Sequence, residues 1–278
     1  MEKIRLNNGV EMPLIGFGTF RSADACADSV ACAIRSGYRM LDTAQIYRNE
    51  AEVGEGIRRS GMDRKELFLT TKVDFRCFGE GTTAHSVEES MKALGTDYLD
   101  LVLLHWPMGD TYAAWRDLEK LYHAGVIRAI GVSNFDAARL TDFILFNEVC
   151  PAVDQIEVHL FNQRRQDREW LRHYNVACQA FMPLGRGRGP EMFEAPAVKA
   201  AAEKYGKTPA QIALKFLVQK GVSIIPKSVH EDRIRQNIDL FDFELTEEEL
   251  TAMEPMDRGI YFAGTAADPS RVLELQKL

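Results

Sequence analysis

Short apolar runs alternate with amphipathic stretches along almost the whole chain of 278 residues. The apolar runs are typical of strands buried on both faces of a parallel sheet. There are eight, at residues 14–18, 38–41, 67–71, 98–104, 126–132, 152–156, 176–180 and 222–225. The intervening stretches have helical spacing and predict helices at residues 23–36, 50–59, 86–94, 112–123, 136–146, 164–173, 196–205, 209–220 and 231–239.

Strands that alternate with helices over short loops predict a parallel sheet with right-handed crossovers. Eight such units in this length favour one (β/α)8 TIM barrel over residues 1–278, with a short C-terminal extension. Asn8-Gly9 predicts a short N-terminal β-hairpin before the barrel. A doubly wound open sheet is the alternative, but Gly16-Phe17-Gly18 lacks the third glycine of a dinucleotide-binding turn.

Composition and charge exclude several classes of protein. A net charge of −7 argues against nucleic-acid and anionic-membrane partners. No apolar run approaches the roughly 18 residues of a membrane helix, and the first residues do not resemble a signal peptide. Five cysteines without CxxC spacing predict reduced thiols in a cytoplasmic protein. The six histidines form no metal-ligand pattern, so we expect no metal.

Polar side chains stand where several predicted strands end. Asp42, Lys72 and His105 follow three successive strands, and Tyr47 lies on the loop after Asp42. The carboxyl ends of barrel strands carry active sites, so we expect these four side chains to meet. A neighbouring ammonium lowers the pKa of a phenol, which predicts Tyr47 as a proton donor supported by Lys72, with Asp42 holding Lys72. A neutral His105 would orient a substrate oxygen. This chemistry suits reduction of a carbonyl by hydride, which requires a cofactor.

A second group of residues indicates what that cofactor contains. Lys227, Ser228 and Arg233 follow the eighth strand and open a helix, where barrels often bind phosphate. A solvated basic helix end is the alternative. Ser133, Asn134 and Gln155 have the donors and acceptors that a carboxamide needs. At the end of another strand, the ring of Phe181 could pack in the core or lie under a planar ring.

Taken together, the motifs resemble the aldo-keto reductase family, in particular bacterial diketogluconate and methylglyoxal reductases. The matching segments span the chain and include Gly16–Phe20, Gly37–Tyr47, Thr71-Lys72, Asp97–Pro107, Arg128–Phe135, Gln155–His159, Pro183-Leu184 and Ile225–Ser228. The resemblance implies reduction of an aldehyde or ketone, with NADPH as donor and Asp42, Tyr47, Lys72 and His105 as the catalytic tetrad. Family members that reduce steroid double bonds carry Glu where His105 stands, so the resemblance favours carbonyl reduction.

The resemblance also implies the remaining site residues. Ser133, Asn134 and Gln155 would bind the nicotinamide carboxamide, with Phe181 stacked on the ring. The adenosine 2′-phosphate would lie against Lys227, Ser228 and Arg233. The other implied cofactor contacts are Gly18, Thr19, Phe20, Asp42, Pro183, Leu184, Val229, Gln236 and Asn237. The implied substrate pocket comprises Phe20, Asp74, His105 and Trp106.

Two positions depart from the pattern of the family, and an alternative function fits the same fold. Asp74 stands where the family often has an apolar aromatic residue, which predicts a more polar pocket that disfavours anionic keto acids. Phe181 replaces the usual Tyr or Trp. A nucleotide-sensing subunit of the same fold, with little turnover, is the alternative function, whereas a metal-dependent barrel hydrolase lacks ligands. We expect a small-molecule carbonyl substrate and a monomer or weak homo-oligomer.

Overall fold

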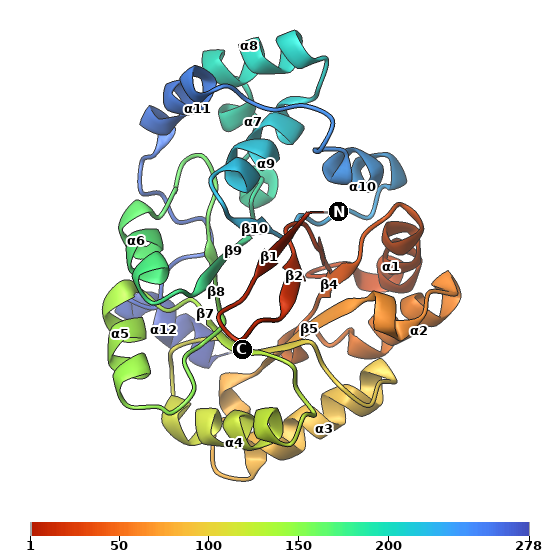
Figure 1. The fold of residues 1–278 in the computed structure, drawn as a ribbon, viewed down its shortest axis with the longest axis vertical. Coiled ribbons are helices and arrows are strands. Elements are labelled where there is room, and N and C mark those ends of the chain that lie inside the picture. The colour runs from red at the N-terminus through yellow and green to blue at the C-terminus, as the bar shows by residue number, and fades with distance from the viewer. Residues whose placement is uncertain (1, 278) are drawn as a thin grey trace.

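The computed structural model describes residues 2–277 and begins with the predicted hairpin. Strands β1 (Lys3–Arg5) and β2 (Glu11–Pro13) pair antiparallel. Gly9 adopts a positive φ of 87° in the turn between them, a conformation that glycine reaches without strain. In Figure 1 the hairpin lies across the near end of the barrel, where it covers the interior.

Eight parallel strands form the centre of the molecule. They are β3 (Phe17–Gly18), β4 (Met40–Asp42), β5 (Phe68–Val73), β6 (Leu101–Leu104), β7 (Ile130–Ser133), β8 (Val153–Glu157), β9 (Ala177–Phe181) and β10 (Ser223–Ile224). Each strand pairs with its neighbour in sequence, from β3 through to β10. Ile15 then bridges Ile224 in parallel, and the Gly16 amide donates to the Ile224 carbonyl at 2.8 Å. The sheet therefore closes on itself, which confirms the barrel and excludes the open doubly wound alternative.

Helices surround the barrel, one layer outside the strands (Figure 1). Those that follow strands β3 to β8 are α1 (Cys26–Arg35), α2 (Glu50–Ser60), α3 (Thr82–Leu94), α4 (Thr111–His123), α5 (Ala137–Leu145) and α6 (Arg165–His173). After β9 and β10 come α7 (Pro190–Phe193), α8 (Pro196–Tyr205), α9 (Pro209–Gln219), α10 (Glu231–Ile238), α11 (Glu247–Met253) and α12 (Pro269–Gln276). Helices α7 and α12 were not expected from the sequence.

Local signals set many helix ends. Gly61 and Gly95 end α2 and α3 in the left-handed conformation, which satisfies backbone groups of the last turn. Thr246, with Glu247-Glu248-Glu249 directly after it in the sequence, has the pattern of a helix start; it caps α11 and exchanges hydrogen bonds with Glu249. Residues 2–277 contain no helix that is both long and apolar enough to cross a membrane.

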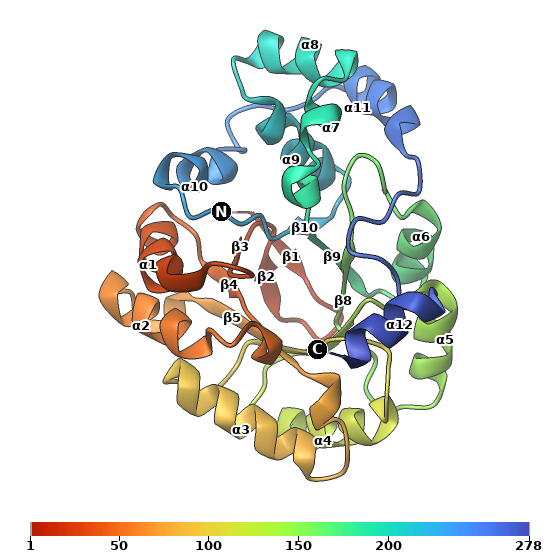
Figure 2. The same ribbon diagram turned by 180° about the vertical axis from the view of Figure 1, so that it is seen from behind.

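Two apolar layers explain why the strands read as continuous apolar runs. Met40, Leu101 and Leu103 fill the barrel interior together with Met12 from the hairpin. The opposite face of the strands packs against the helices in a larger core. All four residues of β6 are buried, as both faces of a barrel strand require. The hairpin covers one end of the barrel, whereas Figure 2 shows the other end, where α12 lies in front.

Candidate active site

Neighbouring strands bring three of the four predicted acid–base residues together. Asp42 is the last residue of β4, Lys72 lies within β5, and His105 directly follows β6. These strands are adjacent, and their carboxyl ends open at one end of the barrel. The apolar pattern predicts that the third strand ends at Thr71, before Lys72, but in the structure β5 continues to Val73. Lys72 is therefore a fully buried strand residue.

Tyr47 reaches the same place from the loop that follows β4. Its backbone belongs to a 3₁₀ turn at Gln45–Tyr47. Buried Asn49 fixes this loop, because its amide donates to the Thr19 carbonyl at 2.9 Å and its oxygen accepts from the Thr43 hydroxyl at 2.8 Å. The hydrogen bonds that position the phenol therefore come from the loop after β3 and from the Tyr47 loop itself.

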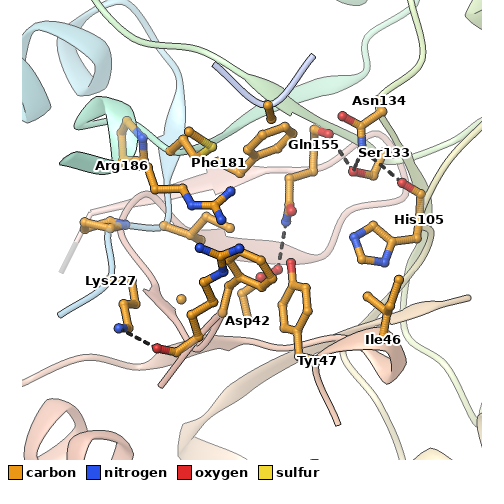
Figure 3. Close-up of a pocket in the computed structure, with 18 of the residues that line it drawn as sticks. Asp42, Ile46, Tyr47, His105, Ser133, Asn134, Gln155, Phe181, Arg186 and Lys227 are labelled. Atoms are coloured by element: carbon orange, nitrogen blue, oxygen red, sulfur yellow. Dashed lines mark hydrogen bonds between the residues drawn. The ribbon is translucent and has the colours of Figure 1, made fainter. Parts of the chain in front are cut away.

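The Lys72 ammonium lies between a carboxylate and the phenol. Its Nζ is 2.5 Å from Asp42 Oδ1, 2.8 Å from the Thr43 carbonyl oxygen and 3.5 Å from the Tyr47 hydroxyl oxygen. The second Asp42 oxygen accepts from Gln155 Nε2 at 2.7 Å. Asp42 is thus held on both oxygens, by Lys72 and by Gln155. Figure 3 shows the bond between Gln155 and Asp42.

The protonation states follow from burial and neighbouring charge. Burial raises the pKa of the Tyr47 phenol, and Lys72 offsets only part of that effect. The pKa of Tyr47 is therefore raised rather than lowered, contrary to the sequence-based expectation, and the phenol is protonated at neutral pH. Burial alone would lower the pKa of Lys72, but Asp42 and Tyr47 together raise it above its usual value. Lys72 consequently carries its charge.

His105 completes the group as a neutral side chain. Burial holds the pKa of His105 well below its usual value, and the Lys72 ammonium lowers it further. The His105 ring stands edge-on to the Tyr47 ring, with centroids 5.7 Å apart. Its buried Nδ1 has no hydrogen-bond partner within residues 2–277. A neutral imidazole and a protonated phenol can together bind one oxygen and deliver a proton to it.

Asp42, Tyr47 and His105 open onto a cavity of about 480 Å³ at this end of the barrel (Figure 3). Its lining contains the predicted residues Gly18, Phe20, Asp42, Tyr47, His105, Trp106, Ser133, Asn134, Gln155, Phe181, Pro183, Leu184 and Lys227. Arg186 also lines the cavity; it belongs to the loop Gly185–Gly189, whose glycines and arginines would suit a strap over a pyrophosphate or form only a flexible loop. The lining residues that the sequence patterns did not single out are Arg21, Ile46, Met182, Ile225, Pro226, Ala263, Arg271 and Leu275. Most of these residues are next to predicted site residues in the sequence, so their position along the chain was the available signal. The last three lie in the C-terminal extension, where the sequence has no comparable signal.

The residues expected near a carboxamide lie together on one wall of the cavity. The Ser133 hydroxyl donates to the Gln155 carbonyl at 2.8 Å, and Asn134 Nδ2 donates to the His105 carbonyl at 3.0 Å. Asn134 adopts a left-handed backbone with φ 65°, which asparagine tolerates better than most residues. Phe181, at the end of β9, is half-buried and faces the same space. Thr19 is fully buried and donates to the Asp42 carbonyl instead of lining the cavity.

The residues expected near an adenosine phosphate lie at the start of α10 and along it. Lys227 lines the cavity, and its ammonium donates to the Arg21 carbonyl at 2.9 Å. The buried Ser228 hydroxyl accepts from the His230 amide at 3.0 Å, just before α10 begins. Val229, Arg233 and Gln236 are exposed, whereas Asn237 is buried. None of these α10-side residues except Lys227 lines the cavity.

Asp74 is the predicted pocket residue that the structure places elsewhere. It does not line the cavity. Its carboxylate accepts from the Arg76 amide at 3.1 Å and forms an ion pair with the Arg76 guanidinium. Asp74 therefore caps the short turn Phe75–Cys77, and its charge is balanced locally. Trp106 does line the cavity, with its ring beside His105.

Metal ligands are not grouped in the part of the chain that the structure describes. Residues 2–277 contain no cluster of three or more His, Cys, Asp or Glu side chains that could hold a metal ion. All five cysteines are free.

Comparison with known proteins identifies the class to which this fold and site belong. The chain matches the Aldo/keto reductase family over residues 14–258. It is 42% identical over 260 residues to glyoxal reductase of Bacillus subtilis, covering 92% of this chain and 93% of that protein. The chain therefore belongs to the aldo/keto reductase family, which confirms the resemblance drawn from the motifs.

Solved structures agree with this assignment. An aldo-keto reductase from a Medee basin deep-sea metagenome library superposes with a TM-score of 0.91 at 37% identity, covering 93% of this chain and 96% of that one. A Bombyx mori aldo-keto reductase, solved in complex with NADP, gives a TM-score of 0.89 at 34% identity, covering 94% of each chain.

Proposed function

We propose that this protein reduces an aldehyde or ketone to the alcohol with NADPH, and that Tyr47 donates the proton. The observation that carries the proposal is the protonated Tyr47 phenol, which opens onto the cavity with the Lys72 ammonium 3.5 Å away. Membership of a reductase family and the NADP complex of the Bombyx mori relative support the same reaction.

Each member of the tetrad has one task in this mechanism. Neutral His105 hydrogen-bonds the carbonyl oxygen and orients it toward the phenol. Tyr47 gives its proton to that oxygen as negative charge develops there. Lys72 stabilises the resulting phenolate, and Asp42 holds Lys72 in place and charged. When bound, NADPH would supply the hydride for the carbonyl carbon, so that the C=O group would gain one hydride and one proton.

The residues present fit NADPH. The cavity joins the Tyr47 hydroxyl to the Lys227 ammonium, so one elongated ligand can reach from the tetrad to the start of α10. Ser133, Asn134 and Gln155 offer amide and hydroxyl groups to a carboxamide, and Phe181 offers a ring face. The adenosine 2′-phosphate would bind Lys227, Ser228 and Arg233. The other proposed contacts are Gly18, Phe20, Pro183, Leu184, Val229, Gln236 and Asn237. Thr19 is fully buried and is not among them.

The test of the mechanism is Tyr47→Phe, which removes only the hydroxyl. Consumption of NADPH would be followed at 340 nm with glyoxal, chosen because a relative is named glyoxal reductase. We expect kcat to fall about 100-fold to 10,000-fold, with NADPH affinity retained, because the proton donor is lost but the cofactor contacts remain. Undiminished turnover in the variant would show that the proton comes from another group. Wild-type protein that binds NADPH but reduces no aldehyde would favour the nucleotide-sensing role.

The cofactor assignment has its own test in Arg233→Ala. Arg233 is exposed on α10, so its removal should leave the fold intact. We expect the Kd for NADPH to rise about tenfold or more and the Kd for NADH to change little, because only NADPH carries the 2′-phosphate. The neighbouring exposed Arg235→Ala, on the same helix, is the matched control. Equal losses for the two cofactors would remove the 2′-phosphate role.

A further inference from the structure

The C-terminal segment, residues 257–277, forms one wall of the cavity. It follows the barrel and ends in α12, which lies over the end of the barrel opposite the hairpin (Figure 2). Ala263, Arg271 and Leu275 from this segment line the same cavity as Tyr47 and His105. The segment therefore takes part in forming the space where the carbonyl substrate would bind.

A buried carboxylate fixes this segment to the barrel. Glu157, the last residue of β8, accepts from the amides of Phe262 and Ala263 at 2.6 and 2.8 Å. His159 Nε2 lies 2.9 Å from the same carboxylate, and the His159 ring stacks on the Phe262 ring. These contacts bridge more than a hundred residues of sequence. They make the wall a docked element whose side chains have defined positions relative to the cavity.

Arg271 is the charged side chain that this wall presents. Its guanidinium lies over the Trp106 ring, 5.7 Å from the centroid, on the side of the cavity that His105 occupies. Its buried Nε has no partner within residues 2–277. Its Nη1 is paired at 3.0 Å with Glu274, a carboxylate that is largely exposed to solvent. Because solvent already stabilises the Glu274 carboxylate, this pair contributes little, and a ligand can compete for the guanidinium.

The charges that line the cavity are strongly unbalanced. One lining carboxylate, Asp42, is already paired with Lys72. The lining cations are Arg21, Arg186, Lys227 and Arg271. The Lys227 ammonium donates to the backbone carbonyl of Arg21 at the end nearest α10, where the proposed cofactor phosphates would neutralise Lys227. The Arg21 guanidinium lies over the Phe20 ring. Nearer the tetrad, Arg186 lies over the Phe20 ring, which adjoins the Tyr47 ring, and Arg271 lies beside Trp106 on the side that His105 occupies.

We propose that Arg271 forms a subsite for a carboxylate on the carbonyl substrate, so that the preferred substrates are carboxylate-bearing aldehydes or ketones. The proposal rests on the function proposed above. A guanidinium pre-positioned on an aromatic ring in a shielded cavity binds carboxylates through charge-assisted hydrogen bonds. The carboxylate itself is unchanged, while the carbonyl carbon accepts hydride and its oxygen accepts the Tyr47 proton. Asp74, which the sequence suggested would repel such substrates, lies off the cavity and is paired with Arg76.

The test compares succinic semialdehyde with its methyl ester, which differ in charge but share the reacting aldehyde. The measured quantity is kcat/KM for the acid divided by kcat/KM for the ester, with saturating NADPH. In the wild-type protein we expect a ratio of about ten or more. Arg271→Met should lower this ratio about tenfold to a hundredfold, because it keeps an unbranched apolar stem but removes the guanidinium.

The matched control is Arg188→Met. Arg188 lies near the same segment, 5.3 Å from the centroid of the Phe262 ring, but does not line the cavity. The ratio should remain at the wild-type value in this variant. A wild-type ratio below one overturns the proposal without any variant. An unchanged ratio in Arg271→Met also overturns it. So does a ratio that falls equally in Arg188→Met and Arg271→Met. If neither compound nor glyoxal is reduced, the proposed function itself fails.

Discussion

Removal of the Lys72 ammonium should reveal how much of the fold and of the chemistry depends on one buried ion pair. Lys72 is fully buried and Asp42 is only 2% exposed, with 2.5 Å between Nζ and Oδ1. Lys72→Met retains most of the side-chain volume but leaves a buried carboxylate without its cation. Breaking a buried pair in this way costs about 3–5 kcal/mol of unfolding free energy. A typical domain has roughly 5–15 kcal/mol in total, so the variant should fold with a much smaller margin.

The double variant Asp42→Asn/Lys72→Met separates the pair from its surroundings. Because it removes both charges, its loss of stability should be smaller than the sum of the two single losses by roughly 1–3 kcal/mol. Urea denaturation followed by tryptophan fluorescence measures these differences. The control is Lys92→Met, which breaks the exposed pair with Glu89 and should leave the denaturation midpoint unchanged.

The same substitution should affect catalysis separately from stability. Lys72 Nζ lies 3.5 Å from the Tyr47 oxygen, so the phenolate left after proton transfer would lose its nearest cation. We expect kcat to fall about 100-fold to 10,000-fold under conditions where the variant is folded. A folded Lys72→Met variant with wild-type kcat would refute the catalytic role of the ammonium. In the denaturation experiment, strictly additive losses of stability would show that the two charges do not interact.

Two further perturbations test the neighbours of this pair. The pKa of His105 lies well below its usual value in the folded protein, so unfolding at acidic pH takes up a proton. The free energy of unfolding should therefore fall as the pH drops below about 6.5. The contribution of His105 is up to about 1.4 kcal/mol per pH unit. His105→Gln should make the urea midpoint less sensitive to pH between 7.5 and 5.5, and an identical pH dependence would contradict the buried neutral state. Glu157→Gln weakens the bonds to the amides of Phe262 and Ala263, so KM for the carbonyl should rise more than kcat falls, with faster proteolysis after residue 257. The exposed Glu191→Gln is its control, and KM and proteolysis that match the wild type would exclude the anchoring role.

Many strands, helices and turns of the barrel could be predicted because the interactions that form them are local in sequence. The Asn8-Gly9 turn, the Thr246 cap and the apolar run of β6 each depend on residues close together in sequence. Boundaries were less certain, since hydrogen bonding to a neighbouring strand extends β5 through Lys72 and shortens β6 at its start. The existence of these elements was therefore clearer from the sequence than their ends.

The same division applies to the site. Asp42, Tyr47, Lys72 and His105 could be selected from the sequence because strand ends in a barrel converge, whatever the details of the packing. The direction of the Tyr47 pKa shift could not be predicted from the sequence, because it depends on the balance between burial and the distance to Lys72. Asp74 was misplaced for a related reason: a position next to a strand end does not reveal that Arg76 folds back onto the carboxylate.

The sequence by itself determined the order of strands and helices, the family to which the chain belongs, and the four residues of the proposed tetrad as candidates. Only the tertiary structure determined which side chains enclose the cavity. Arg271 lies far along the chain from Trp106, and contacts between Glu157 and the amides of Phe262 and Ala263 bring the C-terminal segment to the barrel. Such contacts depend on the three-dimensional position of the whole barrel end, and no periodic pattern in the sequence encodes them.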